Sequence, residues 1–165
     1  MGLQHDFKEA RRKIARLDGQ ERDRLLTICQ AIQQAQAALS HQATPILARC
    51  MTRCQGLCCR NIRVADIVTV WDLVYILTLA PELEPTLAAC LAREDFFPAD
   101  CLFLQNGVGP CLFPEHIRPE RCVISFCRVE PTVEKEIGQV MRGFSRLIRF
   151  FSFRSYRRLM RYFIP

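Results

Sequence analysis

The distribution of cysteine is the feature that most constrains how this chain can fold. The 165-residue sequence contains ten cysteines, and eight of them fall in two groups between residues 50 and 127. Four lie in the ten-residue stretch CMTRCQGLCC, and the other four follow at wider spacing. If these thiols act together, the loops and helix ends that carry them must lie close to one another in the folded chain. The eight are Cys50, Cys54, Cys58, Cys59, Cys101, Cys111, Cys122 and Cys127.

Three interpretations of these thiols are open: a disulfide framework, buried small hydrophobes, or metal ligands. A chain of this length can build its own core, so it does not need disulfides to fold. Its N-terminal residues carry charges and no apolar signal-peptide core, so we expect a cytoplasmic protein with reduced thiols. Thiolate is the ligand that zinc, Cu(I) and iron–sulfur clusters prefer, and we favour metal binding. Cys29 and Cys90 lie on helical apolar patterns and are expected in the core.

The number of thiols limits the kind of metal site. Eight thiolates exceed the four that one zinc ion or one cubane cluster accepts. The adjacent pair Cys58 and Cys59 reaches two metal atoms more easily than it chelates one. Two mononuclear sites, a polynuclear cluster, or one cluster with further thiols around it remain open. Paired C-x-x-C knuckles, typical of zinc, are absent from the sequence, and an iron–sulfur cluster is narrowly preferred over zinc.

Arginines accompany the cysteines, and guanidinium groups can donate hydrogen bonds to sulfur and offset the charge of a thiolate cluster. The alternative is that each arginine is solvated surface. Seven lie within four residues of one of the eight cysteines: Arg49, Arg53, Arg60, Arg63, Arg118, Arg121 and Arg128.

Hydrophobic periodicity predicts a single, compact, mainly α domain with a small β-hairpin, organised around the cysteine metal site. Residues 1–44 are expected to form a helical pair broken at Asp18-Gly19, residues 45–130 the cysteine-cluster core, and residues 131–165 basic amphipathic helices. Thr44-Pro45 has the pattern of an N-cap and first helical residue, which predicts a new helix there.

Within the core region we expect four further elements. They are an apolar helix over 64–79, a shorter helix over 85–93, a hairpin in CLFLQNGVGPCLF, and a short helix opened by Pro119. The longest helix is expected to begin at Pro131 and to break near residues 152–155.

The C-terminal segment is basic and aromatic. Residues 141–165 contain seven arginines and no acidic residue, with arginines and apolar residues on different helix faces. The apolar face can close the core while the arginines are solvated. Alternatively, the segment can bind an acidic protein or an anionic membrane surface. Nucleic acid is disfavoured because no recognition signature accompanies the arginines. No run is long and apolar enough for a transmembrane segment.

The ordered combination CMTRCQGLCCR, CLFL, GPCLF and IRPERCVISFC resembles the YkgJ-type cysteine-cluster family, a zinc- or iron-chelating domain. The resemblance covers about residues 50–127 and implies that the eight cysteines are the metal-site residues and that Arg118-Pro119 is the family's Arg-Pro. It departs in two ways: three residues rather than two separate the first cysteines, and His116-Ile117 stands where an aromatic is common. His116 is therefore either a substitute ligand or an exposed loop residue.

Three functional hypotheses follow. The chain is a metal-binding protein that holds iron, as an iron–sulfur cluster, or zinc, and acts as an electron-transfer or cluster-carrier module. Alternatively it is an iron–sulfur enzyme related to lysine methylase-type group transfer, as one family relative implies, or a structural zinc domain that presents its basic helix to a partner. Whether it is an enzyme is open, because the candidate acid–base residues Asp66, Asp72, Glu115 and His116 have no recognisable catalytic spacing.

Overall fold

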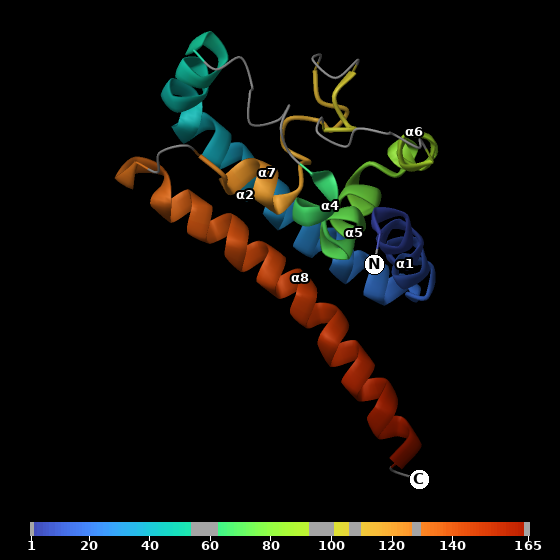
Figure 1. The fold of residues 1–165 in the computed structure, drawn as a ribbon. Helices are drawn as coiled ribbons and strands as arrows, with labels where there is room; N and C mark the ends of the chain where they lie inside the picture. The colour runs from blue at the N-terminus through green and yellow to red at the C-terminus, as the bar shows by residue number, and fades with distance from the viewer. Residues whose placement is uncertain (1, 54–62, 93–100, 106–109, 127–129, 164–165) are drawn as a thin grey trace.

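The computed structural model describes residues 2–53, 63–92, 101–105, 110–126 and 130–163, with the backbone alone for 50–53 and 155–163. These residues are mostly helical, which confirms the predicted class (Figure 1). The elements are α1 (Leu3–Ala15), α2 (Gly19–Arg53), α4 (Val64–Ile67), α5 (Val70–Leu79), η1 (Pro81–Leu83), α6 (Glu84–Leu91), α7 (Glu120–Ile124) and α8 (Pro131–Phe163).

The two long helices, α2 and α8, lie side by side and run antiparallel (Figure 1). Ion pairs join their opposite ends: Arg154 of α8 binds Glu21 near the start of α2, and Arg49 of α2 binds Glu130 just before α8. The helices approach closely where Gly143 faces Ile32, since a Cβ at residue 143 would lie 2.7 Å from Ile32 Cγ1. A larger residue there would push the helices apart.

The core forms where α5 meets these two helices. Tyr75 of α5 packs edge-on against Phe144 of α8 with ring centroids 5.3 Å apart, and Trp71 packs against Phe151 at 5.5 Å. The predicted apolar stripes of α2 and α8 face this core. Their fully or largely buried members include Leu25, Ile32 and Leu39 on α2 and Val133, Val140, Phe144, Leu147 and Phe151 on α8.

The predicted helix start at Thr44-Pro45 is wrong, because α2 continues through Pro45 to Arg53. Proline removes the N–H that would bond the carbonyl four residues earlier, at His41. The Thr44 hydroxyl replaces that donor: its Oγ1 lies 2.9 Å from the His41 carbonyl oxygen and 3.1 Å from that of Ser40. Thr44 therefore repairs the helix interior instead of capping a new helix.

Two other predicted boundaries also move. The apolar helix over 64–79 is divided into α4 and α5, because Thr69 and Asp72 form a capping box that starts α5. The expected break of α8 near residues 152–155 is wrong, since α8 is one helix. Ser152 does not interrupt it because its hydroxyl donates to the Ile148 carbonyl, 3.0 Å away, inside the same helix.

The predicted hairpin is reduced, within the described residues, to one antiparallel bridge between Leu104 and Cys111. Leu112 N–H donates to the Phe103 carbonyl at 2.8 Å, and Gln105 N–H to the Pro110 carbonyl at 3.2 Å. The turn at residues 106–109 lies outside the described part of the chain.

Candidate metal-binding region

The structure describes the side chains of three of the eight predicted ligands, Cys101, Cys111 and Cys122. Cys50 lies in the last turn of α2, where only the backbone is described. The predictions on Cys54, Cys58, Cys59 and Cys127 fall outside the described residues.

Cys101 and Cys111 lie near each other beside the antiparallel bridge that pairs Leu104 with Cys111. Both are half-buried, and Cys111 is itself paired in the bridge with Leu104. The rings of Phe103 and Phe113 pack beside them with centroids 4.6 Å apart and fix the two segments. Burial raises the pKa of the Cys101 thiol, and the nearby Cys111 raises that pKa further. The two sulfurs are therefore close enough to sense each other's charge.

The segment that leads from this bridge to α7 is held by three side chains from the core. The Tyr75 hydroxyl donates to the His116 carbonyl at 2.9 Å. Gln36 makes both backbone hydrogen bonds of Arg118, donating to its carbonyl at 2.8 Å and accepting from its N–H at 3.1 Å. Asp72 accepts from the Glu120 N–H at 2.7 Å. We call Gln36, Asp72 and Tyr75 the clamp.

Asp72 is a buried carboxylate, only 2% exposed, with both oxygens in use. One oxygen accepts from Glu120 N–H, and the other accepts from the backbone N–H and the hydroxyl of Thr69. Burial raises its pKa, and these hydrogen bonds oppose that rise. Asp72 therefore caps α5 through the box with Thr69, and it does so as a buried carboxylate.

Sequence reasoning missed Gln36 and Tyr75, although a signal for Gln36 was present. Gln30, Gln34 and Gln42 of α2 are exposed, whereas Gln36 is 1% exposed. It stands four residues after Ile32 and three before Leu39, which places it within the apolar stripe. A polar residue at a core register indicates a buried hydrogen-bonding partner.

Cys122 lies on α7, two residues after the last backbone group held by the clamp. It is exposed and borders a narrow cavity of about 110 Å³ between α2 and α7. Arg118 lines the same cavity, and Ser40 donates to Glu115 at its rim, 2.8 Å away.

His116 is partly buried, so the expectation of a simply exposed loop histidine is not met. Its Nδ1 is buried, and no hydrogen-bond partner for it lies in the described part of the chain; the same is true of Arg118 Nε. Both atoms belong to the segment that the clamp holds. Asp66 is exposed and pairs with Arg63 at 3.8 Å, away from any such buried group.

The donors that this region offers to a metal are cysteine thiols. Within the described residues, no group of three or more His, Cys, Asp or Glu side chains converges on one point. Two neighbouring thiols, those of Cys101 and Cys111, do suit zinc or an iron–sulfur cluster. A four-ligand site would need at least two further ligands from the other six predicted cysteines.

The two cysteines expected in the core behave differently from the predicted ligands. Cys29 is fully buried on α2, and burial raises its pKa to about 12, so its thiol stays protonated at neutral pH. Cys90 is half-buried on α6 and packs against the core. Their assignment as core residues is confirmed.

The basic C-terminal helix has two distinct faces. Phe144, Leu147 and Phe151 are buried, so this stretch of α8 closes the core. Arg142, Arg146 and Arg149 are exposed on the other face. Of the seven arginines that lie near the cysteines in the sequence, Arg49 and Arg63 pair with carboxylates.

Within the described ranges, no single helix has both the length and the hydrophobicity to cross a bilayer; the segments Val70–Leu79 and Pro81–Leu91 meet that standard only together, across a 116° bend.

Comparison with known proteins gives no assignment, since no family model, curated protein or solved structure matches this chain.

Proposed function

We propose that this protein binds a metal through its clustered cysteines, with an iron–sulfur cluster narrowly preferred over zinc. The observation that carries the proposal is the proximity of the Cys101 and Cys111 thiols beside the antiparallel bridge that pairs Leu104 with Cys111. Two thiolates at one point repel each other, and a cation between them relieves both that repulsion and the cost of burial. The YkgJ-type resemblance, which no comparison tests, points to the same chemistry.

The chain's own residues would orient the ligands. The bridge and the ring pair of Phe103 and Phe113 set the positions of Cys101 and Cys111. The clamp fixes the backbone that leads to Cys122. Cys50, Cys54, Cys58, Cys59 and Cys127 would supply the other thiolates. Bound there, zinc supplies a structural cross-link and an iron–sulfur cluster supplies one-electron chemistry.

The test is metal and acid-labile sulfide analysis with an absorption spectrum, on full-length protein purified without oxygen. We expect iron, sulfide and visible absorption in the wild type, and loss of all three in the double variant Cys101→Ser/Cys111→Ser. Cys90→Ser is the matched control because Cys90 is half-buried but stands outside the eight cysteines. Its metal content should equal that of the wild type.

The outcomes separate the alternatives. Zinc without sulfide would support the structural zinc domain in place of the electron-transfer or group-transfer module. Wild-type protein without stoichiometric metal would contradict the proposal. Retention of full metal content in the double variant would remove the bridge cysteines from the site. Circular dichroism of each variant distinguishes loss of ligands from loss of fold.

A further inference from the structure

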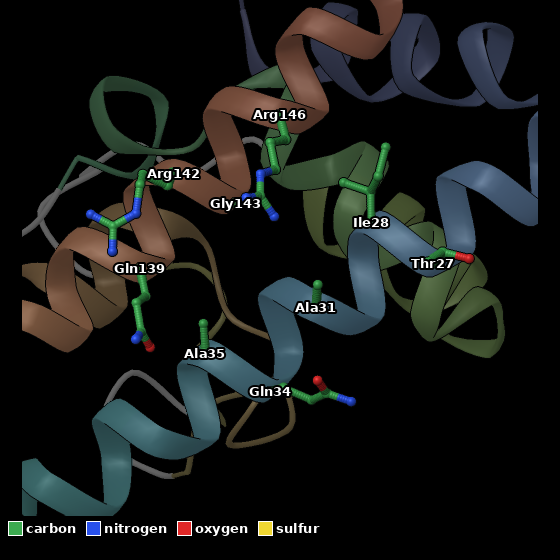
Figure 2. A pocket seen from close by; sticks show the side chains of 9 residues that line it. All are labelled: Thr27, Ile28, Ala31, Gln34, Ala35, Gln139, Arg142, Gly143 and Arg146. Atoms are coloured by element: carbon green, nitrogen blue, oxygen red, sulfur yellow. The ribbon is translucent and has the colours of Figure 1, made fainter.

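A groove of about 530 Å³ runs between α2 and α8 (Figure 2). Its walls come from both long helices, with Ile28, Ala31 and Ala35 on α2 and Arg142, Gly143 and Arg146 on α8. Because Gly143 brings the helix backbones close at Ile32, the small side chains beside that contact leave a furrow in place of a filled surface. The groove is independent of the cysteine region, since none of its lining residues is a cysteine.

The charge of this groove is entirely positive. Arg142 and Arg146 stand one helical turn apart, and none of the lining residues is acidic. Within the described part of the chain, neither arginine forms an ion pair, whereas Arg154 on the same helix binds Glu21 at 2.8 Å. Two cationic side chains therefore border the apolar residues at the base of the groove, and no acidic residue lines the groove beside them.

The orientation of the side chains matches this description. Figure 2 shows Arg146 extending from α8 toward α2, and Ala31 and Ala35 on the facing side of α2. Arg142 lies back along its own helix, with Nη1 3.1 Å from the point where a Cβ on Gly138 would stand. The polar side chains of Gln139 and Gln34 line the groove as well.

We propose that this groove binds an acidic amphipathic helix from another protein. The small side chains of Ala31 and Ala35 leave room for the backbone of a third helix to approach α2 at the 8–10 Å spacing of packed helices. Carboxylates four residues apart on that helix would match the one-turn spacing of Arg142 and Arg146, and its apolar residues would cover Ile28.

Other occupants fit the groove less well. A flat bilayer surface does not reach a recessed floor between two helices. A drug-sized ligand is usually buried over most of its surface, which a furrow open along its length does not provide. A second copy's basic α8 would face arginine with arginine, because the chain has no acidic residue after Glu136.

The test uses full-length protein and a labelled synthetic helix of about 15 residues, near the length at which an isolated helix becomes marginally stable. This probe carries a leucine stripe flanked by glutamates four residues apart, and its matched counterpart has lysines in their place. Fluorescence anisotropy should show binding of the glutamate probe that weakens as salt rises, and no binding of the lysine probe.

Variants then locate the binding site. Arg142→Glu/Arg146→Glu should weaken binding of the glutamate probe by about tenfold or more, since two charge pairs become repulsive. Arg149→Glu is the matched control: Arg149 is exposed on α8 but does not line the groove. Ala31→Trp fills the exposed floor with a large ring and should also abolish binding.

Three results would overturn the proposal. These are failure of the wild type to bind the glutamate probe, an equal loss of affinity in Arg149→Glu and the double variant, or unchanged affinity in Ala31→Trp. Vesicles containing phosphatidylserine provide the last arm. If they bind the wild type and the glutamate probe does not, the basic face of α8 recognises a membrane surface and the groove assignment is wrong. Metal content does not enter any of these readouts.

Discussion

At the scale of single residues, the side-chain amide of Gln36 forms hydrogen bonds with both backbone groups of Arg118. Replacing it by alanine leaves a buried N–H and a buried carbonyl without partners. Gln36→Ala should therefore lower the free energy of unfolding by about 1–3 kcal/mol. Urea denaturation followed by circular dichroism measures this.

The matched control for that change is Gln30→Ala, on the exposed side of the same helix. It should alter stability by less than about 0.5 kcal/mol. If both variants lose the same stability, the loss comes from the helix and not from the clamp. A clamp role also predicts that Gln36→Ala perturbs the NMR signals of residues 116–122 more than those of α1.

Asp72 predicts a defined pH dependence. Burial raises its folded-state pKa above the ordinary value of 3.8, so the unfolded chain gives up this proton more readily. Ionisation of Asp72 therefore lowers the free energy of unfolding. This loss of stability is absent when pH lies below the ordinary pKa and grows as pH rises above it. The loss becomes constant once pH exceeds the raised pKa of the folded state. Asp72→Asn cannot titrate, so its stability relative to the wild type should rise with pH across that window.

Unfolding free energies measured in urea from about pH 4 to about pH 8 test this trend. The absolute stability of Asp72→Asn also contains the lost hydrogen bond from the Thr69 N–H, so only the change with pH is diagnostic. Asp66→Asn serves as the control for the loss of one carboxylate, because the Asp66 side chain is exposed and pairs only with Arg63 among the contacts that the structure describes for it.

At the scale of secondary-structure elements, the approach of α2 and α8 depends on Gly143. A Cβ there would lie 2.7 Å from Ile32 Cγ1, in a packed core. Gly143→Ala should destabilise the protein by about 1–3 kcal/mol through overpacking, although alanine is the better helix former. Gly138→Ala is the matched change on the same helix, where the new methyl meets only the movable end of Arg142.

These two glycine variants should therefore differ in sign. Gly138→Ala should be neutral or should stabilise by up to about 1 kcal/mol, the usual gain when alanine replaces a helical glycine. Thermal unfolding of both variants beside the wild type gives the comparison. Equal stabilisation by both would show that α2 and α8 separate without cost.

Periodicity predicted the existence of the helices well, but their ends depended on single side chains. Leu25, Ile32 and Leu39 recur every seven residues, about two helical turns, and all three are buried on one face of α2. This periodicity could not show that the Thr44 hydroxyl satisfies the carbonyl released by Pro45. Thr44-Pro45 can therefore start a helix in one tertiary context and lie inside a continuous helix in another.

The site was less predictable than the fold for a physical reason. Cysteine spacing indicates which residues have ligand chemistry, but the meeting of two segments depends on long-range contacts. The bridge that places Cys111 near Cys101 pairs it with Leu104, a contact that is local in sequence. The clamp joins Gln36 to Arg118, 82 residues apart, and no local pattern contains that pairing.

At the scale of the whole molecule, α8 serves both the core and the surface, and truncation separates these roles. Phe144, Leu147 and Phe151 are at most 5% exposed, so removing residues 141–165 deletes three buried side chains. Loss of a single large core side chain costs about 3–5 kcal/mol, comparable with the total stability of a small domain. The protein without residues 141–165 should therefore fail to fold cooperatively.

A shorter truncation, removing residues 155–165, keeps these three side chains and the ion pair of Arg154 with Glu21. It should retain a cooperative thermal transition and its metal content, because these contacts with the core and with α2 remain. It also removes three of the seven arginines of the basic segment, Arg157, Arg158 and Arg161. If the chain without 141–165 still unfolds cooperatively, the packing of α8 against α2 is not required for this fold.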